Sequence, residues 1–220
     1  MGRARRATGR HAGLRDHHGA VAGLAVKGAQ RTGREVVALP LPLLVNLVNA
    51  WGSAPRKACG KSAQAYSTLS AWRATSPLAW RQFPRLSATQ LVEVADLVYP
   101  VFAAGSGREC AQSLSRLAEQ AGLTPTMASE GWRVREAWRC AHAGQELLAA
   151  AALALLEHLR ASPDASRLGT CHGQACADVF VDQSPAGLRQ FCSLTCQTRQ
   201  RTRAYRAGKR ETEARSTLGA

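Results

Sequence analysis

Four of the seven cysteines in this 220-residue chain lie in one short stretch near its C-terminal end. Their spacing is Cys-x4-Cys, then 15 residues, then Cys-x3-Cys, at Cys171, Cys176, Cys192 and Cys196. Four thiolates complete the tetrahedral coordination of zinc, and two close pairs joined by a connection of this length are typical of small zinc modules. Because protein ligands fill all four positions, no position remains for a reactive water. We therefore expect a structural Zn2+ ion rather than a catalytic one.

Two other states are open to these cysteines, namely a pair of disulfides or buried free thiols. We identify no secretory signal peptide, and a reducing cytoplasm disfavours disulfides. The segment between the two pairs is too short and too polar to bury a core of its own. Zinc would therefore have to supply the stability of this segment, since metal-binding free energy becomes folding free energy in such modules.

The residues around the cysteines predict the elements that would position them. Residues 179–181 form a short β-rich run, residues 182–187 favour a turn, and residues 189–191 lead back to Cys192, which predicts a β-hairpin carrying the first cysteine pair on one arm. Ser193 is suited to cap a helix whose first turn holds Cys196, where the helix dipole favours a thiolate. Hairpin followed by helix is the order of a treble-clef zinc finger.

The stretch resembles the CGNR zinc finger family of bacterial transcription regulators. The motifs that carry the resemblance are Cys171-x4-Cys176, Phe180-x-Asp182, Arg189-x-Phe191-Cys192-Ser193 and Cys196-x-x-Arg199. Gln197 and Thr198 replace the family's glycine and asparagine, and Phe191 stands where the family usually has tryptophan. The resemblance implies a zinc finger over residues 167–210 and a stress-responsive regulatory role.

A basic segment follows the last cysteine. The stripe arginines, defined as Arg199, Arg203, Arg206 and Arg210, step by four, three and four residues, so a helix would align them, with Arg201 to one side. Gly208 is a candidate helix end, which would leave Arg210 beyond the regular helix. Such a stripe suits phosphate contacts and guanine recognition, and with Arg189 these arginines are the expected nucleic-acid contacts. The alternative is a solvated basic tail.

Charge is concentrated at the two ends of the chain. Lys and Arg outnumber Asp and Glu by 29 to 15, giving a net charge of +14. Residues 1–34 carry +7 and residues 197–215 carry +5, which leaves the rest nearly neutral. We expect a disordered basic tail over residues 1–34 and a polyanionic partner at one or both ends of the chain. Three interpretations of residues 1–34 stay open: an uninformative tail, a flexible DNA-contacting arm, or residues upstream of the true start. The longest apolar run, residues 147–156, is shorter than the roughly 20 residues of a membrane span, so we expect a cytoplasmic protein with no membrane partner.

Hydrophobic periodicity predicts a mainly α fold, with a helical domain over residues 35–162 before the finger and a tail over residues 211–220. We expect five helices. The first begins after Pro42, the second spans residues 63–74, and the third runs from a capping box at Ser87 to Gly105 with a kink at Pro100. The fourth spans residues 108–121 and the fifth residues 133–160, with residues 123–131 as the connection between them. We expect five tryptophans to anchor the core or its edge: Trp51, Trp72, Trp80, Trp132 and Trp138.

The start of this domain resembles the ABATE domain, which accompanies the CGNR finger in that family. Residues 45–50 read Val-Asn-Leu-Val-Asn-Ala against a Leu-Asp-Phe-Val-Asn-Thr signature, so Asn49 matches and Asn46 replaces the aspartate. Two interpretations remain open for Asn46 and Asn49: satisfied polar groups on a core helix, or a binding site for an unknown small-molecule effector. The domain would sense such a ligand or form a homodimer.

No catalytic motif accompanies these features. The chain lacks H-E-x-x-H, G-x-S-x-G and P-loop sequences, and Cys59, Cys110 and Cys140 are scattered. His142 and His158 are too far apart to chelate one ion from one helix. We therefore expect no enzyme activity. The leading hypothesis is a DNA-binding transcription regulator, and the alternative is a zinc-stapled adaptor that binds protein or RNA.

Overall fold

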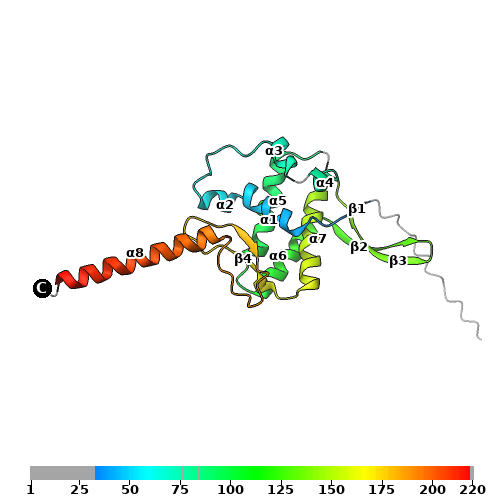
Figure 1. Ribbon diagram of the computed structural model, residues 1–220. Coiled ribbons are helices and arrows are strands. Elements are labelled where there is room, and N and C mark those ends of the chain that lie inside the picture. Colours follow the sequence, from blue (N-terminus) through cyan, green and yellow to red (C-terminus); the bar gives the residue numbers. More distant parts are fainter. Residues whose placement is uncertain (1–32, 76, 84, 219–220) are drawn as a thin grey trace, which may run out of the picture. The chain divides into compact units, whose positions relative to one another are not determined.

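The computed structural model describes residues 33–75, 77–83 and 85–218, with the backbone alone for residues 78, 79 and 211–218. Nearly all of the predicted basic tail, residues 1–34, therefore lies outside the described residues. The helices before the finger are α1 (Leu41–Trp51), α2 (Ser53–Ala58), α3 (Leu69–Ala74), α4 (Pro77–Trp80), α5 (Ala88–Phe102), α6 (Gly107–Gln120) and α7 (Glu146–Ala161) (Figure 1).

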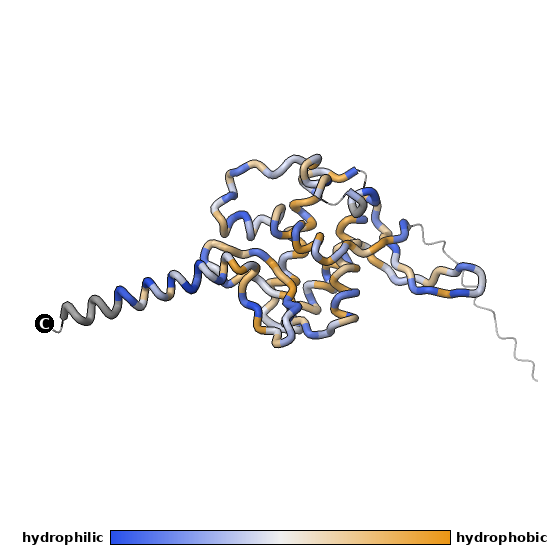
Figure 2. Tube along the Cα trace, in the orientation of Figure 1, coloured by the Kyte–Doolittle hydropathy of each residue, from blue (hydrophilic) through white to orange (hydrophobic). Residues whose placement is uncertain are grey.

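Helix α7 is the centre of the core. Residues 147–155 are all buried, as expected for a helix that is apolar on every side. Helices α1, α5 and α6 pack against α7, and α5 also packs against α1 and α6. Figure 2 shows the hydrophobic stretches gathered in this bundle. No helix among the described residues is both long enough and apolar enough to span a bilayer.

Side-chain caps set the starts of the next helices. The Ser87 hydroxyl accepts the N–H of Gln90 at 3.1 Å, and the Gln90 side chain accepts the N–H of Ser87 at 2.9 Å, which confirms the predicted capping box. Helix α5 contains Pro100 and ends at Phe102, before Gly105. Ser106 caps α6, which matches the predicted helix to within a residue at each end.

The helix predicted over residues 63–74 is shorter than expected. Thr68 caps α3 by accepting the N–H of Ala71 at 3.2 Å, so the helix starts at Leu69. A row of ring contacts links α1 to this region. Trp51 lies 6.0 Å from Trp72 between ring centroids, and Trp72 lies 5.8 Å from Trp80. These three tryptophans are buried, as predicted.

The prediction for residues 123–160 is wrong in its first half. The expected connection and the start of the expected long helix form a hairpin of β2 (Leu123–Glu130) and β3 (Arg133–Cys140). Strand β1 (Arg34–Val36) adds to β3, giving an antiparallel sheet of order β1-β3-β2. Gly131, with φ +62°, allows the two-residue turn. The predicted helix over residues 133–160 therefore began too early, because α7 starts only at Glu146 and residues 133–140 form β3.

The tip of this hairpin also contradicts the role predicted for one tryptophan. Trp132 is fully exposed, and Met127 and Val134 in the same hairpin are about two-thirds exposed. Trp138, at the base of the hairpin, is partly buried against the core. Only the base of the hairpin therefore contributes to the core.

Candidate metal centre

Four sulfur atoms converge in the C-terminal part of the chain. The Sγ atoms of Cys171, Cys176, Cys192 and Cys196 all lie within 4.8 Å of one another. Cys192 Sγ is 3.7 Å from Cys176 Sγ and 3.6 Å from Cys196 Sγ. In a tetrahedral site with Zn–S bonds of about 2.3 Å, neighbouring sulfurs are about 3.8 Å apart. The four thiols therefore fit a zinc ion in spacing, number and chemistry.

The first cysteine pair lies between two strands. Strand β4 (Leu168–Thr170) follows the 3-10 turn η1 (Ala165–Arg167) and pairs antiparallel with β5 (Val179–Val181). The predicted hairpin had the wrong partner, because β5 pairs with the segment before it and not with residues 189–191. Cys171 and Cys176 thus lie in the loop that joins the strands. The N–H of Cys171 donates to the carbonyl of Asp178 at 2.8 Å and closes this loop.

A glycine explains the actual pairing. Gly169 lies opposite Phe180, and a Cβ on Gly169 would meet Cζ of Phe180 at 2.9 Å. The missing side chain leaves space for the buried Phe180 ring over β4. A glycine within a strand is a sequence signal of close backbone approach, and Gly169 carries that signal.

The loop between the first two cysteines is compact around Gly173. The N–H of Gly173 donates to Cys171 Sγ at 3.3 Å, and the N–H of Cys176 donates to the carbonyl of Gly173 at 3.1 Å. A Cβ on Gly173 would lie 3.2 Å from Cys171 Sγ and 3.3 Å from Cys196 Cβ. Ala175 completes the loop with φ +57°, the only positive φ of a non-glycine residue in the described part of the chain.

Asp182 organises the return to the second cysteine pair. Asp182 is 5% exposed as a residue, and its carboxylate accepts the N–H groups of Ser184 and Arg189, each at 2.8 Å. Hydrogen bonds from the Ser184 side chain and the Arg189 N–H lower the pKa of Asp182 to about 2. Residues 182–189 are thus held by hydrogen bonds to the ionised carboxylate of Asp182 instead of by pairing with a strand.

Arg189, predicted to contact nucleic acid, is engaged within the finger. Its guanidinium donates to the carbonyls of Phe191 at 2.8 Å and Val181 at 3.3 Å, and also to the carbonyl of Cys192. The same group lies 4.9 Å from the centroid of the Phe180 ring. We assign Arg189 a structural role, because these carbonyls hold its side chain against β5 and the third cysteine. A nucleic-acid contact for it stays a prediction.

The thiols differ in acidity when no metal is bound. Burial raises the pKa of Cys176 to about 12 and also raises the pKa of Cys192. Burial also opposes ionisation of Cys171, but hydrogen bonds outweigh it and lower the pKa of that thiol. Zinc must therefore displace protons from at least Cys176 and Cys192 when it binds.

The second cysteine pair leads directly into α8 (Leu194–Leu218). The N–H of Cys196 donates to the Ser193 hydroxyl at 3.3 Å, which confirms the predicted cap and places Cys196 in the first turn. Gly208 does not end the helix. The segment predicted as a tail, residues 211–220, is helical as far as Leu218.

The predicted arginine stripe lies on one face of α8. The four stripe arginines line this face together with Thr195, Thr198 and Thr202, whereas Arg201 lies off it. Residues 198–210 are all exposed, and Figure 2 shows this stretch as largely hydrophilic. Among residues whose side chains the structure describes, no carboxylate forms an ion pair with a stripe arginine.

The two asparagines of α1 border the finger. Asn49 Nδ2 donates to the carbonyl of Val179 at 3.0 Å, and its Oδ1 accepts the N–H of Val179 at 2.7 Å. Asn46 is exposed, and both asparagines line a groove of about 380 Å3 between α1 and β5. Both polar atoms of the Asn49 amide are thus used by the finger backbone. Ligand binding by Asn46 and Asn49 stays a prediction.

Comparison with known proteins supports the metal site. Residues 167–209 match the sequence model of the CGNR zinc finger, and this range contains all four cysteines. No curated protein matches the chain. The match and the geometry of the four thiols together identify a structural zinc site.

Proposed function

We propose that the protein is a DNA-binding transcription regulator in which a structural zinc ion fixes the start of a basic helix. The proposal rests on one observation: Cys196 is a zinc ligand in the first turn of the helix whose next turns present the stripe arginines. The metal would hold that helix against the β4–β5 hairpin, in the manner of a treble-clef finger.

The charge of α8 supports a polyanionic partner. Residues 194–210 contain five arginines and one lysine and no acidic residue. Like charges at i,i+4 positions, such as Arg199 with Arg203, destabilise a helix in isolation. Phosphates between these side chains would turn repulsion into attraction, and contacts with guanine edges would add sequence preference.

The helical domain would supply regulation through its contact with the finger. Asn49 on α1 holds the backbone of Val179, so a shift of α1 would move the residue that directly precedes Phe180 and Val181, both of which contact Arg189. An effector bound near Asn46, or dimerisation, would then alter the finger. We propose this sensing role for residues 35–162 within a cytoplasmic regulator.

A mobility-shift titration with zinc-loaded full-length protein tests the proposal. The triple variant Arg199→Ala, Arg203→Ala, Arg206→Ala removes three charges from the stripe. The matched control removes three exposed charges elsewhere: Arg81→Ala, Arg108→Ala, Arg116→Ala. The stripe variant should bind duplex DNA at least tenfold more weakly and lower the log–log salt slope by about 2 to 3. Equal binding by both variants would refute a role for the stripe.

The exposed hairpin favours a second candidate function, a zinc-stapled adaptor that binds protein or RNA. Met127, Trp132 and Val134 are exposed apolar residues of this hairpin, and tryptophan is enriched at protein-binding hot spots. A complex that survives nuclease and high salt in pull-downs but is lost with Trp132→Ala would favour the adaptor. Retention of the complex only in the presence of nucleic acid would favour the DNA-binding function.

A further inference from the structure

The arginine face of α8 also carries methyl groups. Thr195, Thr198 and Thr202 alternate with the arginines on this face, and Leu194 stands at its N-terminal end. These residues recur at spacings of three and four, so their methyl groups follow the same side of the helix as the guanidinium groups. The result is a mixed surface of positive charge and small apolar contacts.

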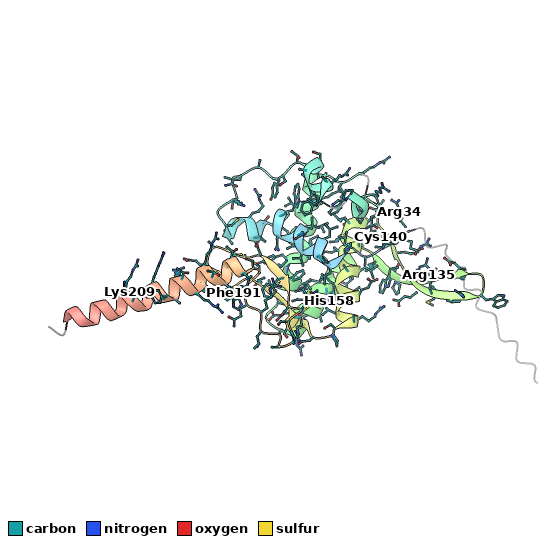
Figure 3. All side chains as sticks on the ribbon, in the orientation of Figure 1. Arg34, Arg135, Cys140, His158, Phe191 and Lys209 are labelled. Carbon is teal, nitrogen blue, oxygen red and sulfur yellow. The ribbon has the colours of Figure 1, made fainter. Side chains whose placement is uncertain are left out.

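Exposed leucines extend this surface at the base of α8. Leu194 is 80% exposed and Leu188 is 78% exposed. Both line a groove of about 380 Å3 with Phe191, which lies beside the start of α8 (Figure 3). Leu194 belongs to both surfaces, so the apolar groove is continuous with the arginine face. No described residue buries either leucine.

We propose that this face reads thymine 5-methyl groups in the major groove of duplex DNA, through Leu194 and the neighbouring threonines. The inference rests on the proposed DNA-binding function and names its partner more narrowly. Leucine and the methyl group of threonine make apolar contacts of the kind that distinguish thymine, while arginine pairs with guanine O6 and N7. Gln200 lies off this face, and Gln197 lines only the groove at its base.

The same chemistry separates DNA from other polyanions. Uracil has no 5-methyl group, and the deep, narrow major groove of A-form RNA does not admit a helix. An acidic protein would satisfy the arginines without requiring methyl groups. The preferred sites should therefore contain guanines next to thymines on the strand that α8 faces.

The test has two stages and uses zinc-loaded full-length protein. Selection from a random duplex library first yields a preferred site. Binding is then measured to that duplex, to the same duplex with deoxyuridine in place of thymidine, and to an RNA duplex of the same sequence. Leu194→Ala is compared with Gln200→Ala, a variant off this face.

Loss of each contacted methyl should weaken wild-type binding about fourfold, and RNA should bind far more weakly. Leu194→Ala should bind the thymidine duplex more weakly and lose part of its sensitivity to deoxyuridine, whereas Gln200→Ala should behave as wild type. Equal affinity for thymidine and deoxyuridine duplexes, or for DNA and RNA, would overturn the inference while leaving nucleic-acid binding intact. Failure to bind any duplex at low salt would instead refute the proposed function, and the inference with it.

Discussion

Asn49 holds Val179 by both of its backbone polar groups, donating to the carbonyl at 3.0 Å and accepting from the N–H at 2.7 Å. The two residues are 130 positions apart in sequence. One side chain of α1 thus makes the two hydrogen bonds that a neighbouring strand would make with the backbone of β5, the strand that follows the first cysteine pair. This pair of hydrogen bonds makes the finger continuous with the helical core.

Replacing Asn49 should loosen that junction. Asn49→Ala leaves the N–H and carbonyl of Val179 without protein partners, and the expected loss in unfolding free energy is about 1 to 3 kcal/mol by chemical denaturation. Asn46→Ala, three residues earlier and exposed, should change the unfolding free energy by less than about 0.5 kcal/mol. Similar losses in both variants would contradict the role assigned to Asn49.

The compact loop between Cys171 and Cys176 gives a second prediction. Gly173→Ala brings a Cβ to within 3.2 Å of Cys171 Sγ, so a thiolate must shift and zinc affinity should fall roughly tenfold or more in a chelator competition assay. The control is Ala175→Gly in the same loop. Ala175 is exposed with positive φ, so glycine should relieve backbone strain and preserve zinc affinity or increase it slightly. An unaffected Gly173→Ala protein would remove the steric argument.

The lowered pKa of Asp182 should make the stability of the finger depend on pH. The pKa of Asp182 in the folded state is about 2, below its ordinary value of 3.8, so ionisation of this carboxyl favours the folded state. The contribution is fully present above pH 4 and is lost as pH falls from about 4 to 2. Asp182→Asn should lower the melting temperature at neutral pH. It should also remove this part of the acid dependence, seen as a smaller fall in melting temperature between pH 4 and 2 than in wild type under the same zinc-containing conditions.

The affinity for zinc should also depend on pH, in a range above the one in which Asp182 titrates. Because burial raises the pKa of Cys176 to about 12 and also raises that of Cys192, the metal-free site holds protons that zinc must displace. Apparent zinc affinity should therefore rise with pH between 6 and 8, with proton release detectable by calorimetry in buffers of different ionisation enthalpy. Absence of proton release would show that the site is already ionised.

The parts of the structure that could be predicted from sequence are those set by local chemistry. Cysteine spacing predicted the four ligands, and Ser87 and Ser193 predicted helix starts that the structure confirms. The apolar period predicted α5 and α6. Each of these features depends on residues a few positions apart, where spacing alone determines the geometry.

The errors arose where distant residues decide the structure. Residues 133–140 have enough apolar character for a helix, but pairing with β1 and β2 makes them a strand. The prediction that β5 pairs with residues 189–191 is wrong, because the contact between Gly169 and Phe180 that favours β4 exists only in the folded chain. The roles of Asn49 and Arg189 likewise depend on backbone groups that are adjacent only in the folded chain.

The central claim is that one zinc ion, held by four cysteines, fixes the start of α8. Native mass spectrometry of the full-length protein purified with zinc supplied tests it most directly. The account predicts one zinc ion per chain in the wild type and loss of that ion in Cys171→Ser and Cys196→Ser, with Cys59→Ser, an exposed cysteine outside the site, as the control that retains it. A wild-type chain that carries no zinc, or a Cys196→Ser chain that binds zinc as tightly as wild type, would contradict it.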